Sequence, residues 1–376
     1  MVIFATILAV LLAGSLAYCV LVIIAARRYL AVKLPQTGPA HPISILKPLC
    51  GRDEGLAANL RSFFHQDYPE FEIVFGVHRA DDSAAEVAEA LITEFAGRVS
   101  ARVIVTGESS IPNAKAYSLN RLVQEARHEL LVMADSDVRI GPDLLAHLSR
   151  ELQDERIGLI TCPYTAIGGE SVWSRLEAVG MNTELLGGVL VARMLEGMRF
   201  ALGCTLAVRR CVLEAMGGFG YLQEYLAEDF VIGQRAAEMG HEVLLSSAVI
   251  EHRIGSQDMM PNLSHRLRWA RSTRRSRPAG YWGQVFTYTT ALALLLLAAW
   301  PKAWPLVVFA LVLRFVAAAV TNRIVRDPLM RRQWWLLPVQ DVLGFMVWMG
   351  GFLGDTIVWR DRKCTVLRDG RLHVNT

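Results

Sequence analysis

Two strongly apolar regions enclose a middle region in which apolar residues recur at the periods of strands and helices. The first apolar run extends from Val2 to Ala26 and is long enough to cross a bilayer. In the second region, Phe286 to Trp300 and Trp304 to Val320 read as two spans that meet at Pro301-Lys302. A third apolar stretch, Trp334 to Trp359, is interrupted by two aspartates. The pattern predicts a multi-pass membrane protein.

Basic residues next to these runs indicate how the chain is oriented. No basic segment precedes the first run and Arg27-Arg28 follow it directly, which favours a retained anchor over a cleaved signal peptide. The positive-inside rule then places the residues after this anchor in the cytoplasm. Three C-terminal spans would, however, put the arginine-rich tail Arg360 to Arg371 outside. Either the third stretch is re-entrant or interfacial, or the rule fails here.

The region between the membrane segments, residues 28–280, is predicted to form one α/β domain. Short apolar strands alternate with helical patterns, which indicates parallel pairing and a nucleotide-binding fold. The expected strands cover 43–46, 71–77, 102–105 and 130–133, and the expected helices cover 56–64, 84–95 and 116–127. No Gly-x-Gly-x-x-Gly follows the first strand and no P-loop occurs, which argues against a dinucleotide cofactor. The predicted division is an anchor over 1–27, this domain, and a membrane region with a basic tail over 281–376.

Composition narrows the location of the middle region. The chain has 376 residues, of which 53% are hydrophobic, and a net charge of +3. Six cysteines are scattered without a Cys-x-x-Cys pair, so neither a disulfide framework nor a zinc site is indicated. This pattern fits a reducing cytosolic location. No nucleic-acid partner is expected.

The most informative motif is the apolar strand Leu131 to Ala134 followed by Asp135-Ser136-Asp137. In an open α/β sheet, ligands gather beyond the carboxyl ends of the strands. Two carboxylates at that edge can hold a divalent cation between protein and phosphate. The motif is short, and its alternative is a solvated turn with Pro142 and Asp143 just beyond it.

Several further motifs occur together in the order and spacing of one enzyme family. They are Ile45-Leu46-Lys47-Pro48-Leu49, Asn59 to Phe64, Asp67-Tyr68-Pro69, Asp81-Asp82, Asp135-Ser136-Asp137, Ala227-Glu228-Asp229 and Arg268-Trp269. Through them, residues 41–277 resemble the ceramide glucosyltransferases, and they are at least as similar to bacterial enzymes that glycosylate hopanoid lipids. The resemblance implies a GT-A fold with a Rossmann-like mixed sheet, a nucleotide-sugar donor, a divalent cation and inversion at the anomeric carbon.

The resemblance assigns donor binding to side chains at the strand ends. Asp137 would hold Mg²⁺ or Mn²⁺, with Asp135 oriented towards the ribose or the waters of the metal, so that the charge of the leaving pyrophosphate is neutralised. Asp81 or Asp82 would accept hydrogen bonds from the base or ribose, whereas the alternative for Asp82 is a helix N-cap. Lys115 would meet the diphosphate or the uracil edge, and its alternative is a solvated loop lysine.

An inverting displacement also needs one base on the acceptor hydroxyl. Asp229 is the candidate base, with Glu228 as a helper, because this acidic pair follows a glycine-rich loop and precedes a helix. The alternative is that both are first-turn charges favoured by the helix dipole.

A cluster of six arginines between Arg266 and Arg277 follows the acidic pair. The family signature here is Gln or Arg, two residues and then Arg-Trp, and this chain has His265 at the first position. Arg268 is expected on the pyrophosphate, because a guanidinium fork suits phosphate oxygens, and Trp269 is expected beside the acceptor. The others are expected to form a patch on anionic lipid: Arg271, Arg274, Arg275 and Arg277.

These observations predict a membrane-anchored GT-A glycosyltransferase of a bacterial inner membrane with a cytoplasmic catalytic domain. It would move a hexose, by default glucose, from a UDP-sugar to the hydroxyl of a membrane lipid such as ceramide. The close alternative is N-acetylglucosamine transfer to a hopanoid polyol, since no histidine lies between His147 and His241, where the ceramide enzymes have a functional one. A processive polysaccharide synthase and a lipid-binding scaffold are the less favoured alternatives.

Overall fold

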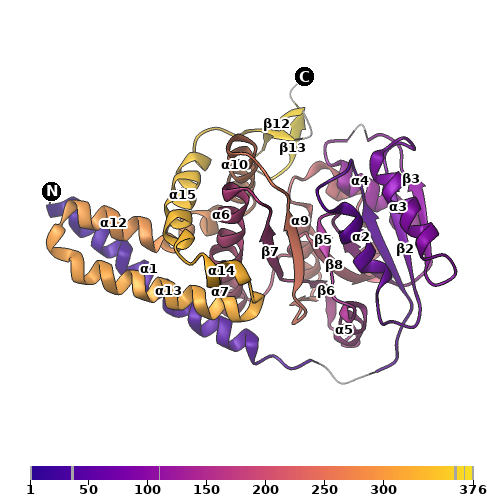
Figure 1. Ribbon diagram of the computed structural model, residues 1–376, viewed down its shortest axis with the longest axis horizontal. Helices are drawn as coiled ribbons and strands as arrows, with labels where there is room; N and C mark the ends of the chain where they lie inside the picture. The colour runs from indigo at the N-terminus through magenta and orange to yellow at the C-terminus, as the bar shows by residue number, and fades with distance from the viewer. Residues whose placement is uncertain (1, 35–37, 110, 360–361, 368, 375–376) are drawn as a thin grey trace.

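The computed structural model describes residues 2–34, 38–109, 111–359, 362–367 and 369–374, and a seven-stranded mixed sheet forms the centre of its α/β domain (Figure 1). In order across the sheet, the strands are β3 (Ser100–Val105), β2 (Phe71–Val77), β1 (Ile43–Pro48), β4 (Leu130–Ala134), β8 (Thr205–Arg209), β6 (Ile157–Thr161) and β9 (Glu242–Leu245). This arrangement confirms the predicted α/β class.

The first half of this sheet matches the four expected strands. β3, β2, β1 and β4 are parallel, and β1, β2 and β4 are almost wholly buried, as expected for strands covered on both faces. The helices that connect them are α2 (Leu56–Phe64), α3 (Ser83–Glu94) and α4 (Ala114–Glu125). Because β4 ends at Ala134, the Asp135-Ser136-Asp137 motif lies at the carboxyl edge of the sheet.

A second sheet of three short strands packs beside this edge. It consists of β5 (Val138–Arg139), β10 (Ile250–Ile254) and β7 (Tyr164–Gly168). His252 of β10 lies opposite Val138 of β5, one residue after Asp137. The antiparallel pairing of β5 with β10 therefore places a histidine next to the acidic motif.

Helices complete the α/β domain and the elements that border it. Their bounds are α5 (Leu144–Glu151), α6 (Val172–Gly180), η1 (Met181–Leu185, a π-helical turn), α7 (Leu186–Glu196), α8 (Arg210–Ala215), η2 (Tyr221–Glu224), α9 (Glu228–Glu238), α10 (Met259–Ser276), α11 (Pro278–Gly283) and η3 (Gln284–Thr287). The acidic pair Glu228-Asp229 forms the first two residues of α9.

Three apolar helices extend together away from the α/β domain (Figure 1). α1 (Val2–Leu30) packs along α12 (Thr289–Ala299) and α13 (Trp304–Val325), and η4 (Pro301–Ala303) joins the last two. By length and composition the segments Val2–Leu30, Val172–Glu196 and Pro301–Val325 are candidates to cross a membrane. The segment Pro278–Thr287 forms a bent pair with α12, at an angle of 62°, and is a further candidate.

The third C-terminal apolar stretch, Trp334 to Trp359, is divided between a helix and a strand. α15 (Leu336–Gly351) has 16 residues, and Gly354 then adopts a left-handed φ of 81° that turns the chain into β11 (Thr356–Trp359). The small α14 (Pro328–Arg332) precedes α15, which packs against α6, α10 and α12. Instead of one apolar segment reaching Trp359, the chain forms a short helix and then a strand.

The C-terminal residues form a three-stranded sheet that we call the C-terminal sheet, made of β11, β12 (Arg362–Val366) and β13 (Leu372–Val374). Arg371 pairs with Tyr225 of the α/β domain, so this sheet lies on the same side of the apolar helices as that domain. The side of the membrane on which the basic tail lies stays a prediction. Arg360 and Arg368 of the basic tail lie outside the described residues.

A buried ion pair connects the apolar helices. Arg314 of α13 donates through Nη2 to Asp341 Oδ1 of α15 at 2.7 Å and through Nε to Oδ2 at 3.0 Å. The Thr290 hydroxyl of α12 donates to the same carboxylate at 2.7 Å. A buried charge is tolerated only when it is paired and hydrogen-bonded in this way. The ion pair and the Thr290 hydrogen bond therefore connect α12, α13 and α15 to one another.

Candidate active site

Asp135 is held at the end of β4 by contacts with its backbone. The Asp135 amide donates to the Cys204 carbonyl at 3.1 Å, and the Lys47 ammonium donates to the Asp135 carbonyl at 2.7 Å. Lys47 is fully buried and its Nζ lies 3.6 Å from the centroid of the Phe63 ring. Burial lowers the pKa of Lys47 to about 7. Lys47 is thus a core residue that supports Asp135.

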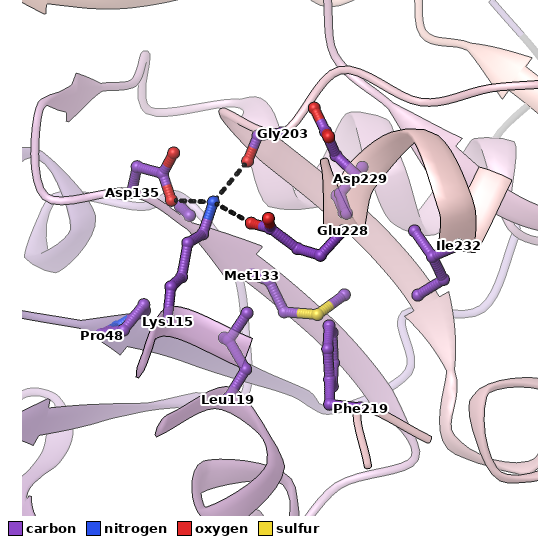
Figure 2. A pocket seen from close by; sticks show the side chains of 12 residues that line it. Pro48, Lys115, Leu119, Met133, Asp135, Gly203, Phe219, Glu228, Asp229 and Ile232 are labelled. Carbon is purple, nitrogen blue, oxygen red and sulfur yellow. Dashed lines mark hydrogen bonds and ion pairs between the residues drawn. The ribbon is translucent and has the colours of Figure 1, made fainter. Parts of the chain in front are cut away.

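Lys115 bridges the acidic residues of two distant segments, as Figure 2 shows. Its Nζ lies 2.7 Å from Asp135 Oδ1 and 3.1 Å from Glu228 Oε1, and it donates to the Gly203 carbonyl at 3.4 Å. Burial lowers the pKa of Lys115, but the two carboxylates outweigh burial and hold it well above its ordinary value. The side chain is therefore a cation. Its position at the start of α4 excludes the solvated-loop alternative.

Asp229 lines the same pocket as Lys115 and Asp135. A Cβ atom on Gly203 would lie 2.8 Å from Asp229 Oδ2, so only glycine leaves room for this carboxylate. The Phe230 amide donates to Asp229 Oδ1 at 2.8 Å. Burial, followed by the charge of Glu228, raises the pKa of Asp229 to about 7. A carboxylate with that pKa is suited to accept a proton near neutral pH.

Asp137 faces His252 rather than Lys115. The His252 Nε2 lies 3.1 Å from Asp137 Oδ2, whereas Asp137 Oδ1 is buried and has no hydrogen-bond partner among the described residues. Burial raises the pKa of Asp137, but His252 and the nearby lysines outweigh burial and keep it below its ordinary value. An ionised, partly unsatisfied carboxylate at this edge fits a divalent cation.

Comparison with known proteins identifies the family. The chain matches the model of glycosyl transferase family 21 over residues 6–372. It belongs to this family. The resemblance to ceramide glucosyltransferases is thereby confirmed.

Two relatives and one solved structure illustrate the range of similarity to this family 21 chain. Ceramide glucosyltransferase 1 of Caenorhabditis elegans is 28% identical over 207 residues, which are 54% of this chain and 44% of the relative. Beta-monoglucosyldiacylglycerol synthase of Trichormus variabilis is 22% identical over 335 residues, 86% of this chain and 66% of the relative. The chain spans about half the length of the ceramide glucosyltransferases of C. elegans that it matches.

The mannosyltransferase PcManGT of Pyrobaculum calidifontis, solved with GDP-Man and Mn²⁺, has a similar structure. The TM-score is 0.56 at 17% sequence identity, and the match covers 93% of this chain and 99% of the mannosyltransferase. At that identity the match concerns the fold, which is of the GT-A type. The GT-A expectation from sequence is therefore confirmed.

The two aspartates after β2 occupy different environments in the family 21 chain. Asp82 is the N-cap of α3, and its Oδ1 accepts from the amides of Ala84 and Gly51, both at 2.9 Å. Asp81 forms a forked ion pair with Arg79 and is exposed. Neither lines the pocket around Asp229. The helix N-cap that was the alternative for Asp82 is present, and contact of either residue with the donor stays a prediction.

The Arg-Trp signature lies on α10, and neither Arg268 nor Trp269 is among the residues that line the pocket. His265, in the first signature position, places Nδ1 2.9 Å from Glu177 Oε1 of α6, and its ring centroid lies 5.2 Å from that of Trp269. His265 thus connects α10 to α6. Arg268 is half-buried on α10 and Trp269 is partly exposed. Their contacts with donor and acceptor stay predictions.

The other four arginines of the cluster contact protein groups, which differs from the expected lipid patch. Arg277 pairs with Glu196 at 2.7 Å, and Arg275 pairs with Asp355 at 2.6 Å. Arg274 donates to the Phe352 carbonyl at 3.1 Å and Arg271 donates to the Leu353 carbonyl at 2.9 Å. Arg271, Arg274 and Arg275 therefore hold the segment between α15 and β11, whereas Arg277 connects α10 to α7. Sequence spacing could not show this, because the partners lie about eighty residues further on or back.

Sequence reasoning missed three residues that support the site. The sequence assigns Lys47 no role beyond its place in the Ile45-to-Leu49 motif, and it assigns none to Gly203 or Asn113. Asn113 is fully buried, caps α4 and donates to Glu228 Oε2 at 3.0 Å. A signal was available for Asn113, because asparagine just before a helical pattern is a strong N-cap. No local pattern distinguishes Gly203.

Proposed function

We propose that this chain transfers glucose from UDP-glucose to a hydroxyl group of a membrane lipid, with inversion at the anomeric carbon. The observation that carries the proposal is the shared pocket of Asp135, Lys115 and Asp229 in a GT-A fold joined to apolar helices. Glucose and a lipid acceptor are favoured because the names of the family relatives specify glucosyl transfer to ceramide or diacylglycerol.

The donor diphosphate would bind at the acidic motif, beside Asp137. Asp137 Oδ1 is buried without a partner among the described residues, so Asp137 is the side chain that would hold a divalent cation. The described residues contain no cluster of three or more metal-ligating side chains, so donor oxygens and water would complete the coordination. Such a cation, when bound, supplies Lewis-acid stabilisation of the leaving diphosphate. Lys115 neutralises Asp135 and keeps its carboxylate oriented.

Asp229 would act as the base on the acceptor. The lipid hydroxyl oxygen forms a bond to the anomeric carbon while the bond from that carbon to the UDP oxygen breaks. The hydroxyl proton passes to Asp229, and UDP leaves with the electron pair. Glycine at position 203 leaves room for the Asp229 carboxylate. A single carboxylate is sufficient, because an inverting displacement forms no covalent enzyme intermediate.

The membrane arrangement of the proposed enzyme follows from its apolar surfaces. Ile7 of α1, Leu294 of α12 and Phe309 of α13 are large apolar side chains exposed on the helical bundle. We assign residues 1–27 and the helices within 281–376 to the bilayer and residues 28–280 to the cytoplasm, because Arg27-Arg28 follow the first helix.

The test is a transfer assay with the purified full-length protein in lipid vesicles and Mg²⁺ or Mn²⁺. It crosses UDP-glucose, UDP-galactose and UDP-N-acetylglucosamine with ceramide, diacylglycerol and a hopanoid polyol, and lipid products are measured by mass spectrometry. We expect a monoglucosylated lipid from UDP-glucose and none from Asp229→Asn, which should still bind UDP-glucose. N-acetylglucosaminyl hopanoid or a polymer would overturn the proposed substrate, and full transfer by Asp229→Asn would overturn the proposed base.

A further inference from the structure

The C-terminal sheet contacts the segment that immediately precedes the acidic pair. Arg371 and Tyr225 form an antiparallel backbone bridge, and the Leu226 amide donates to the Gly370 carbonyl at 3.5 Å. Leu226 packs against the apolar face of the sheet, which consists of Ile357, Cys364, Val366 and Leu372. Leu226 is only two residues before Glu228.

The same segment is held from the opposite direction by Asn113 at the start of α4. The Asn113 side chain donates to the Tyr225 carbonyl at 2.9 Å and to Glu228 Oε2 at 3.0 Å. Its amide donates to the Gln223 carbonyl at 2.9 Å. The chain from Gln223 to Glu228 therefore lies between α4, which carries Lys115, and the C-terminal sheet.

The C-terminal sheet is itself fixed to α10. Arg274 and Arg275 both pair with Asp355 at the start of the sheet, and Arg271 donates to the Leu353 carbonyl. At the other end of the sheet, Arg371 Nη1 lies 3.4 Å from Glu224 Oε2. The Arg371 Cζ atom lies over the Tyr225 ring, 5.6 Å from its centroid. The sheet thus connects α10 to the segment that enters α9.

We propose that the C-terminal sheet positions Asp229 for transfer, with Leu226 and Arg371 as its positioning residues. This inference rests on the proposed role of Asp229 as base. Position matters because a general base acts only within hydrogen-bond reach of the proton it removes. A misplacement of about 1 Å can lower a catalytic rate about a hundredfold. In the proposed function the donor binds at the acidic motif after β4, which is a different segment from the one that the sheet contacts at Tyr225.

The experiment compares Leu226→Ala with Leu226→Met and with the control Leu367→Ala in the full-length protein. Leu367 lies in the C-terminal sheet region, between β12 and β13, and is 41% exposed. Leu226→Ala should lower kcat about tenfold or more with an unchanged KM for UDP-glucose, a split expected for lost positioning. Leu226→Met should restore most of kcat, and Leu367→Ala should leave both constants unchanged. An unchanged kcat in Leu226→Ala, or a rise in KM alone, would overturn the inference.

A second pair of variants and a second measurement keep the inference testable if Leu226→Ala misfolds or if the proposed function is wrong. Arg371→Ala removes an exposed side chain, and Arg156→Ala is its control because Arg156 pairs with Asp154 on a remote surface. Hydrogen exchange of residues 221–232 should be faster in Leu226→Ala and Arg371→Ala and unchanged in Arg156→Ala. This measurement decides the positioning role even if no lipid is glycosylated by the wild type, and unchanged exchange would overturn it.

Discussion

Lys115 Nζ lies 2.7 Å from Asp135 Oδ1 and 3.1 Å from Glu228 Oε1, so one cation joins the acidic motif after β4 to the acidic pair that begins α9. The two carboxylates come from segments more than ninety residues apart in the chain. In the proposed enzyme, this single ammonium influences both donor binding and the charge of the neighbouring base.

Replacing Lys115 with Gln should therefore change two properties at once. Asp135 and Glu228 lose their shared partner, and the positive charge that lowers the pKa of Asp229 is removed. We expect weaker UDP binding by about tenfold or more and a shift of the transfer pH profile to higher pH. Calorimetry with UDP and rate measurements across pH test both, with exposed Lys33→Gln as control. Normal binding with an unshifted profile would contradict the assigned role.

The pH dependence of transfer should follow Asp229. Its pKa is raised to about 7, and the base must be deprotonated, so the rate should rise with pH through about 7 and fall below it. Glu228→Gln removes a neighbouring negative charge that raises this pKa, so its profile should shift to lower pH. The measurement is kcat against pH at saturating donor. A rate that increases as pH falls below 6 would exclude Asp229 as base.

Gly203→Ala tests the space beside the base. The added Cβ would lie 2.8 Å from Asp229 Oδ2, which forces the carboxylate to move. We expect kcat to fall about a hundredfold while UDP binding is retained. Gly283→Ala is the matched control, because a Cβ there meets nothing within 4 Å. Wild-type turnover by Gly203→Ala would show that the carboxylate position is not critical.

The buried Arg314–Asp341 pair should contribute to stability. Arg314→Met leaves Asp341 buried with Thr290 as its one remaining side-chain partner among the described residues, and breaking a buried pair costs about 3–5 kcal/mol. The double variant Arg314→Met/Asp341→Leu should recover much of this loss. Arg61→Met breaks an exposed pair with Glu94 and should change stability by about 0–1 kcal/mol. Thermal unfolding in detergent measures all three, and equal stabilities of Arg314→Met and Arg61→Met would contradict the prediction.

The sequence predicted the parallel half of the sheet closely, because each of its strands is a short apolar run followed by a helical pattern. It also placed Asp135 and Asp137 at a strand end. It did not predict that Lys47, in the same kind of apolar strand, is buried beneath Asp135. A lysine is ordinarily exposed, and only the contact with the Asp135 carbonyl and the Phe63 ring explains its burial.

The arginines of α10 show the limit of local reasoning most clearly. Their spacing and their position next to an apolar region favour a lipid-binding surface, yet Arg274 and Arg275 bind Asp355. The third apolar stretch shows the same limit, because hydropathy alone does not distinguish a span from a short helix followed by a strand. The arginines contact a residue about eighty positions away, and α15 packs against α6 and α10, which are also remote in the sequence.

By itself, the sequence determined the α/β class, the apolar helices, the acidic motifs and the family, because these depend on local periodicity and on motifs in a fixed order. The tertiary structure decided which charges meet: Lys115 with Glu228, His252 with Asp137, and the C-terminal sheet with Tyr225. Contacts of this kind join residues about a hundred or more positions apart, as between Tyr225 and Arg371, 146 residues apart. Such pairings depend on how whole elements pack, and no local pattern of residue types encodes them.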